Sequence, residues 1–91
     1  MLIRSQDKET LTNFNSSVVI NVVDIEGTVK IVCSYSCDDY IIGYYSSKAK
    51  ALKVLDMIQE AYERYEYEKA FKTGLTLFEA FQMPADSKVE V

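Results

Sequence analysis

Histidine is absent from this chain of 91 residues, and cysteine occurs only twice. Because histidine is the commonest general base and the commonest metal ligand in proteins, its absence removes most hydrolase mechanisms and most zinc enzymes. Two cysteines without histidine cannot complete a tetrahedral zinc site. The chain also lacks a Ser/His/Asp set and a glycine-rich nucleotide-binding motif. We therefore expect a protein that is not an enzyme and that holds neither a metal nor a cofactor.

The two cysteines, Cys33 and Cys37, form a C-x3-C pair. Two interpretations stay open for them. Cytosolic proteins usually keep such residues as reduced thiols, whereas a disulfide needs the chain to reverse its direction between them.

Long apolar runs are missing as well. No segment approaches the roughly 20 residues that cross a bilayer, and the first residues contain no apolar stretch long enough for a secretory signal. We expect a cytoplasmic protein without membrane contact.

Basic side chains are in the minority, with 10 Lys and Arg against 14 Asp and Glu, so that the net charge is −4. This balance argues against broad electrostatic attraction to nucleic acid or anionic lipid. Direct nucleic-acid binding is therefore not expected, and a protein partner with a basic surface is favoured.

The apolar fraction of 48% is typical of a folded domain, and the length suits one domain over residues 1–91. Two β-branched runs, 18–23 and 28–33, flank Glu26 and Gly27, which predicts a hairpin with a two-residue turn. One face of this hairpin is then drier than the other. The drier face carries Ile20, Val22, Ile31 and Cys33, and the other face carries Asn21, Val23, Lys30 and Val32.

A third strand is expected at 40–45, after a polar reversal, which makes an antiparallel meander. Met1–Arg4 and Thr10–Phe14 flank a polar turn, and we expect them to pair as a shorter hairpin on the same sheet. Neighbouring strand residues point to opposite faces, so one of Tyr44 and Tyr45 should lie outside the core.

Beyond Tyr45 the apolar residues recur every three or four positions, which predicts one amphipathic helix over about 47–72. Ser46 or Ser47 suits its N-cap, and Gly74 suits its end. The segment 75–84 is an apolar tail that fits either a last strand or a short helix, and 85–91 are expected to fray. The predicted fold is α+β: an antiparallel sheet of four or five strands over 1–45, packed against this helix.

The predicted helix concentrates acids on the face opposite its apolar stripe. At 100° per residue, Asp56, Glu60, Glu63 and Tyr67 lie together on that face. Carboxylates can replace phosphates as partners of Lys and Arg, so such a face suits docking into a basic groove that normally holds nucleic acid. The competing interpretation is a solvated helix face on which Glu60 and Arg64 form a weak ion pair.

The start of the predicted helix carries the opposite charge. Lys48, Lys50 and Lys53 lie where the helix dipole is already positive, beside Ser46 and Ser47. Together with Arg4, these residues are candidates for holding a phosphate or another anion. A solvated lysine cluster is the competing interpretation, because the segment lacks the glycines of phosphate-binding loops.

An edge strand, or the sheet face that the single helix cannot cover, is a further candidate surface. It carries Val23, Val32 and either Tyr44 or Tyr45, and apolar residues with tyrosine suit a homodimer interface.

Three stretches together carry a resemblance to other proteins: Leu2–Asp7, Gly43–Ile58 and Phe81–Pro84. In this order the chain resembles, over nearly its whole length, a group of short, mostly uncharacterised proteins of Gram-positive bacteria, their phages and integrated elements. No activity is attached to that group, so no catalytic residue is carried over. The resemblance implies a context: the cytoplasm of a bacterial host, and the small phage-encoded binders that interfere with host defence, anti-CRISPR inhibitors included.

The leading functional hypothesis is a non-enzymatic inhibitor of a CRISPR effector that docks its acidic helix face into a basic nucleic-acid groove. Two alternatives stay open. One is a module that sequesters a nucleotide or small anion with Arg4, Lys48, Lys50 and Lys53, and the other is a structural or regulatory homodimer.

Overall fold

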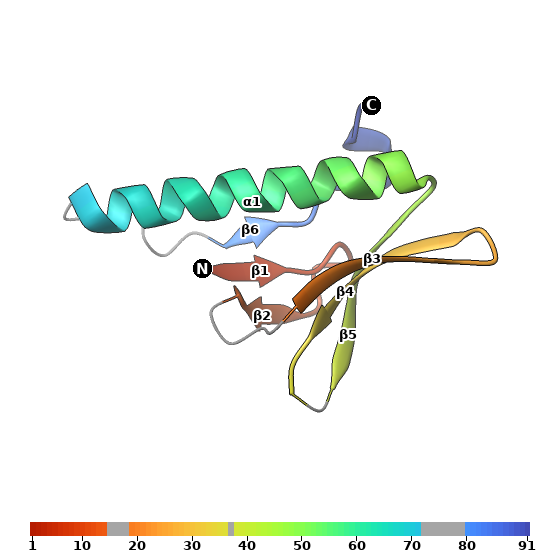
Figure 1. The fold of residues 1–91 in the computed structure, drawn as a ribbon, viewed down its shortest axis with the longest axis horizontal. Coiled ribbons are helices and arrows are strands. Elements are labelled where there is room, and N and C mark those ends of the chain that lie inside the picture. Colours follow the sequence, from red (N-terminus) through yellow and green to blue (C-terminus); the bar gives the residue numbers. More distant parts are fainter. Residues whose placement is uncertain (15–18, 37, 72–79) are drawn as a thin grey trace.

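The computed structural model describes residues 1–14, 19–36, 38–71 and 80–91. Its strands and helices form an α+β fold, which confirms the predicted class (Figure 1). In chain order they are β1 (Leu2–Arg4), β2 (Leu11–Asn13), β3 (Val19–Ile25), β4 (Thr28–Ser34), β5 (Asp39–Tyr45), α1 (Lys48–Phe71), β6 (Phe81–Gln82) and the 3-10 helix η2 (Asp86–Lys88).

The predicted hairpin forms between β3 and β4, with Ile25 opposite Thr28. Glu26 and Gly27 between them have φ angles of 51° and 82°. Positive φ at both central residues is the requirement of a type I′ turn, whose twist matches that of the strands. Ile31 and Cys33 on the drier face are fully buried, as the alternation predicts.

The strand β5 completes this sheet beside β4, in the order β3-β4-β5. A β-bulge interrupts the register between Ile31 and Val32. Tyr45 is buried and Tyr44 is exposed, as expected for neighbours on one strand. A Cβ at Gly43 would lie 2.9 Å from the Tyr45 ring, so glycine leaves room for that ring to fold back over the strand.

The first hairpin also forms, with Ile3 of β1 opposite Thr12 of β2. It does not join the main sheet as expected. It belongs to a second sheet of order β2-β1-β6, because β1 pairs on its other edge with β6, in parallel, placing Ile3 opposite Phe81. The described part of the apolar tail therefore contains a short strand, β6, and no helix, and 75–79 lie outside the described residues.

The helix α1 runs above both sheets (Figure 1). Its observed start lies within one residue of the expected start, and the described part of the helix reaches Phe71; residue 72 and the proposed terminator Gly74 lie outside the described residues. Ser47 is the N-cap, since its hydroxyl accepts a hydrogen bond from the backbone N–H of Lys50 at 3.2 Å. Buried residues from α1, both sheets and the C-terminal segment form one core: Met1, Ile3, Val29, Ile31, Cys33, Ile42, Tyr45, Ala51, Val54, Ile58, Met83 and Val89.

The prediction that residues 85–91 fray is wrong for residues 86–89. η2 spans Asp86–Lys88, and Val89 is only 5% exposed within the core. The contacts that hold this segment come from residues about 40 positions away, which no local pattern records.

Among the described residues, no helix is long and apolar enough to span a membrane.

Candidate functional site

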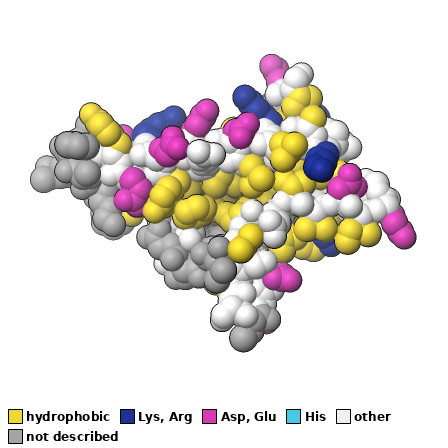
Figure 2. Space-filling model, in the orientation of Figure 1, with side chains coloured by type: hydrophobic (Ala, Val, Ile, Leu, Met, Phe, Trp, Pro, Cys, Tyr) yellow, Lys and Arg dark blue, Asp and Glu magenta, His cyan; other side chains and the backbone are white. Residues whose placement is uncertain are grey.

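The predicted acidic face lies on the outer side of α1. Asp56, Glu60 and Glu63 are exposed, and Tyr67 is 60% exposed. At a rise of 1.5 Å per residue, about 6 Å of helix separates the first two carboxylates and about 4.5 Å the next two. Figure 2 shows acidic side chains along α1, with basic side chains between them. The structure thus brings the four residues together along one ridge, which we call the acidic face.

No cation among the described side chains forms an ion pair with the carboxylates of the acidic face. Within the described ranges the one ion pair joins Lys50 to Asp86, so the Glu60–Arg64 pair of the competing interpretation does not form. Glu63 accepts a hydrogen bond from the side-chain amide of Gln59 at 3.1 Å, which holds one carboxylate without neutralising it.

Another acid of the same helix is used inside the molecule. Glu66 is half-buried and hydrogen bonds to Tyr62; this bond, followed by burial and by the charge of Glu66, raises the pKa of the Tyr62 phenol. Glu66 therefore serves the chain's own contacts, whereas Asp56, Glu60 and Glu63 of the same helix face solvent.

The start of α1 holds the second candidate cluster. The backbone N–H of Ser46 donates to the Asp86 carboxylate at 2.8 Å, and the Lys50 ammonium lies 3.5 Å from the same carboxylate. The bond from Ser46 is the main reason that the pKa of Asp86 is lowered, and the charge of Lys50 adds to it. The chain's own carboxylate therefore occupies the place at which a bound anion was expected.

The remaining residues of that cluster are separate. Lys48 and Lys53 are exposed. Arg4 lies on β1, where its guanidinium donates to the Lys8 carbonyl at 3.3 Å. None of the hydrogen bonds or ion pairs found in the described residues joins these three side chains to Ser46 or Ser47.

Sequence reasoning missed Asp86 and also Gln6. The Gln6 side-chain amide exchanges two hydrogen bonds with the backbone of Tyr44, at 2.9 and 2.7 Å, and so acts as an extra strand residue at the edge of β5. It also donates to the Pro84 carbonyl at 3.3 Å. Gln6, Tyr44 and Pro84 each belong to one of the three stretches quoted for the resemblance, so these stretches meet at this junction. Their inclusion in those stretches was the only feature of the sequence that singled out Gln6.

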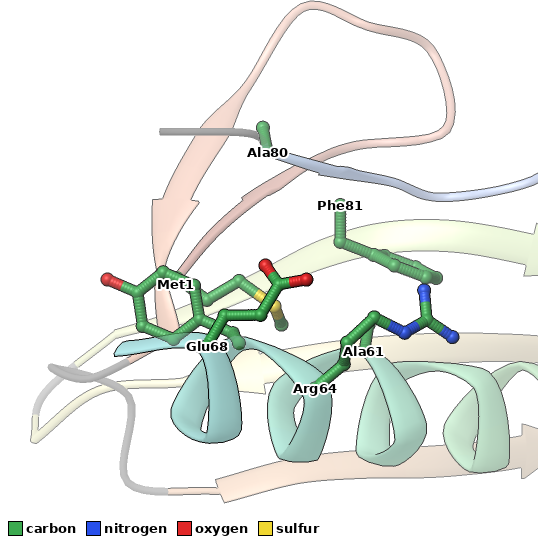
Figure 3. Close-up of a pocket in the computed structure, with 7 residues that line it drawn as sticks. Met1, Ala61, Arg64, Glu68, Ala80 and Phe81 are labelled. Carbon is green, nitrogen blue, oxygen red and sulfur yellow. The ribbon is translucent and has the colours of Figure 1, made fainter. Parts of the chain in front are cut away.

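A hollow of about 170 Å³ lies between α1 and β6 (Figure 3). The Arg64 guanidinium lies beside the ring of Phe81, and the Glu68 carboxylate projects toward the same space. Drug-sized ligands usually need about 300 Å³ or more, so this hollow is small for one. Its residues also include no nucleophile with an adjacent base.

The outer face of the main sheet is partly exposed and carries several apolar residues. Ile41 is 43% and Tyr44 54% exposed, Val23 is half-buried and Val32 is buried, and Lys30 and Asn21 lie on the same face. The sequence predicted this face, and the structure identifies Tyr44 as its tyrosine.

Within the described parts of the chain, no group of three or more Cys, Asp and Glu residues is arranged to hold a metal ion. No protein-family model, curated protein or solved structure matches this chain.

Proposed function

We propose that this protein is a non-enzymatic binding protein of a phage or mobile element that inhibits a CRISPR effector. Its acidic face docks into a basic groove of the effector and competes with nucleic acid for that groove. The observation that carries the proposal is the ridge of three exposed carboxylates, none of which forms an ion pair with a cation in the part of the chain that the structure describes.

The acidic face suits this role because a helix holds its carboxylates at fixed spacing. Carboxylates accept charge-assisted hydrogen bonds from Lys and Arg much as phosphates do. Tyr67 adds a large, exposed aromatic surface at one end of the ridge, and tyrosine is enriched among residues that dominate binding energy. The basic groove therefore gains both charge pairing and an apolar anchor.

The first test is DNA cleavage by guide-loaded CRISPR effectors from Gram-positive bacteria, with and without this protein. Wild-type protein should inhibit at least one effector, and Glu60→Lys/Glu63→Lys should lose that inhibition while its far-UV circular dichroism stays unchanged. The matched control is Glu9→Lys/Glu90→Lys, because these two exposed acids are not part of α1 or of the acidic face. Both variants raise the net charge of −4 by four units, to zero.

Inhibition that survives in Glu60→Lys/Glu63→Lys would remove the acidic face from the mechanism. Equal loss in both double variants would show that net charge, and no particular surface, determines inhibition. If wild-type protein inhibits no effector, the anti-CRISPR assignment is wrong.

A second candidate function, a regulatory homodimer, is favoured by the exposed apolar residues at the edge and on the outer face of the main sheet, Ile25, Ile41 and Tyr44 among them. Apolar patches of this kind on a soluble protein usually mark an interaction site. The nucleotide-binding alternative is not carried further, because Asp86 occupies the Ser46 amide and the Lys50 ammonium, and Arg4 is bonded elsewhere, to the Lys8 carbonyl.

A further inference from the structure

The strand β3 forms one edge of the main sheet, and β4 is its only strand neighbour among the described residues. The two-residue turn makes Ile25 and Thr28 a hydrogen-bonded pair, and alternate residues of β3 therefore direct their peptide groups to β4. The N–H and C=O groups of Ile20, Val22 and Asp24 point the other way, along the open edge.

This edge lacks the features that normally prevent strands from pairing. Proteins protect exposed edges with lysine, proline, bulges or short strands. β3 is seven residues long, contains neither lysine nor proline, and pairs with β4 without a bulge. Asp24 is its one charged residue. A long unprotected edge of this kind favours pairing with another strand.

Apolar surface borders the edge on both sides. On the outer face, Ile25 is 58% exposed. On the inner face, a hollow of about 340 Å³ lies between β3 and α1, and its lining includes Ile20, Leu55 and Gln59. An added strand would therefore cover apolar groups as well as satisfy backbone groups.

We propose that β3 pairs antiparallel with β3 of a second copy of this chain, about a two-fold axis at Val22. Val22 then lies opposite its own copy, and Ile20 lies opposite Asp24. Each copy contributes three strands to one six-stranded sheet. The inference rests on the proposed homodimer and names the strand that forms it.

Charge selects this register over its neighbour. An axis at Asp24 would place the two Asp24 carboxylates opposite each other and bring each Glu26 close to the junction, and like charges in such positions are destabilising. An axis at Val22 keeps Asp24 beside an apolar residue of the partner strand. A second copy is favoured over a foreign strand because one two-fold contact pairs the β3 edge of each copy. Neither β3 edge then stays open, and the assembly is closed.

The test is sedimentation equilibrium of the full chain from about 1 μM to about 1 mM, a range that reports weak and moderate dimers. Wild-type protein should approach twice its monomer mass as concentration rises. Val22→Pro removes an edge N–H that β4 does not use, and proline is tolerated at such edge positions, so this variant should fold and stay monomeric. Ile41→Lys, on the outer face of β5, should still dimerise.

Cross-linking tests the register separately, and it decides the question if Val22→Pro does not fold. Cα atoms of a hydrogen-bonded antiparallel pair lie about 5.5 Å apart, within disulfide range. Under mild oxidation Val22→Cys should give a covalent dimer, whereas Asp24→Cys and wild-type protein should not.

Four results would overturn the inference. Wild-type protein that stays monomeric throughout removes the homodimer as well. A dimer that Ile41→Lys abolishes and Val22→Pro leaves intact assigns dimerisation to the outer sheet face and excludes the β3 edge. A covalent dimer of Asp24→Cys would place the two-fold axis at Asp24. A Val22→Cys variant that forms no covalent dimer would show that the axis does not lie at Val22.

Discussion

At the scale of single residues, Tyr45 connects the main sheet to the C-terminal segment. Its hydroxyl donates to the Pro84 carbonyl at 2.8 Å, and its ring is 5% exposed. Burial, with a smaller contribution from the charge of Asp86, raises the pKa of Tyr45 from 10.0 to about 12. The folded state therefore keeps its proton over a pH range in which the unfolded chain loses it.

This pKa predicts an alkaline loss of stability. Between pH 10.0 and about 12 the folded state binds more protons than the unfolded state, so the free energy of unfolding falls as pH rises. The loss from Tyr45 reaches up to about 3 kcal/mol, since one pKa unit corresponds to about 1.4 kcal/mol. Tyr45→Phe should cost about 1 kcal/mol at pH 7 through the lost hydrogen bond and should show a shallower alkaline decline. Urea unfolding at pH 7 and between pH 10.0 and about 12 measures the free energy of unfolding of both proteins. If that free energy falls with pH as steeply in Tyr45→Phe as in wild-type protein, the alkaline loss does not come from Tyr45.

Asp86 predicts a stability that depends on pH with the opposite sign, since it falls as the pH is lowered. Its pKa is lowered below 3.8, chiefly by the N–H of Ser46, so its stabilising contribution is complete above pH 3.8 and is lost as pH falls further. Asp86→Asn should have a lower thermal midpoint at pH 6 and a smaller drop in that midpoint from pH 4 to pH 2. The exposed Glu90→Gln is the control. If Asp86→Asn and wild-type midpoints fall in parallel below pH 4, the carboxylate does not stabilise the start of α1.

At the scale of elements, the C-terminal segment is part of the core. Met83 is 1% exposed, and its backbone N–H donates to the Arg4 carbonyl at 3.0 Å, just beyond the pairing of β1 with β6. A domain of this size has little stability to spare.

Met83→Ala should therefore lower the free energy of unfolding by about 3 kcal/mol, since it removes a buried side chain and leaves a cavity. Chemical denaturation measures the loss, with the exposed Glu90→Ala as control. A loss below about 1 kcal/mol would mean that the segment packs only loosely on the sheets.

Elements with local signals were predictable from the sequence. Gly27 between two β-branched runs specified the hairpin, and the spacing of Ala51, Val54 and Ile58 specified the helix and, with it, the acidic face. The pairing of β1 with β6 and the contact of Asp86 with Ser46 were not predictable. They join residues far apart in the chain, and each depends on the folded arrangement of elements that lie between them.

At the scale of the whole molecule, charge is unevenly distributed. Asp56, Glu60 and Glu63 lie on the outer side of α1, whereas β3 carries Asp24 as its one charged residue and is otherwise apolar except for Asn21. The surfaces proposed for the effector and for a second copy therefore differ in chemistry.

This distribution predicts that inhibition depends on salt. Exposed charge pairs are screened over about 8 Å at physiological ionic strength and over shorter distances at higher salt. Raising the salt concentration should weaken binding to the effector, whereas dimerisation through an apolar strand edge should weaken little. Titrations at two salt concentrations measure both equilibria, and salt-independent binding would argue against the acidic face.

The most direct measurement of the central claim uses an isosteric change in the acidic face. Glu60→Gln/Glu63→Gln removes two charges and keeps the size of both side chains. Its dissociation constant for an effector that wild-type protein inhibits should rise by about tenfold or more, which is about 1.4 kcal/mol, with an unchanged thermal midpoint. An unchanged dissociation constant would show that these carboxylates do not contact the partner.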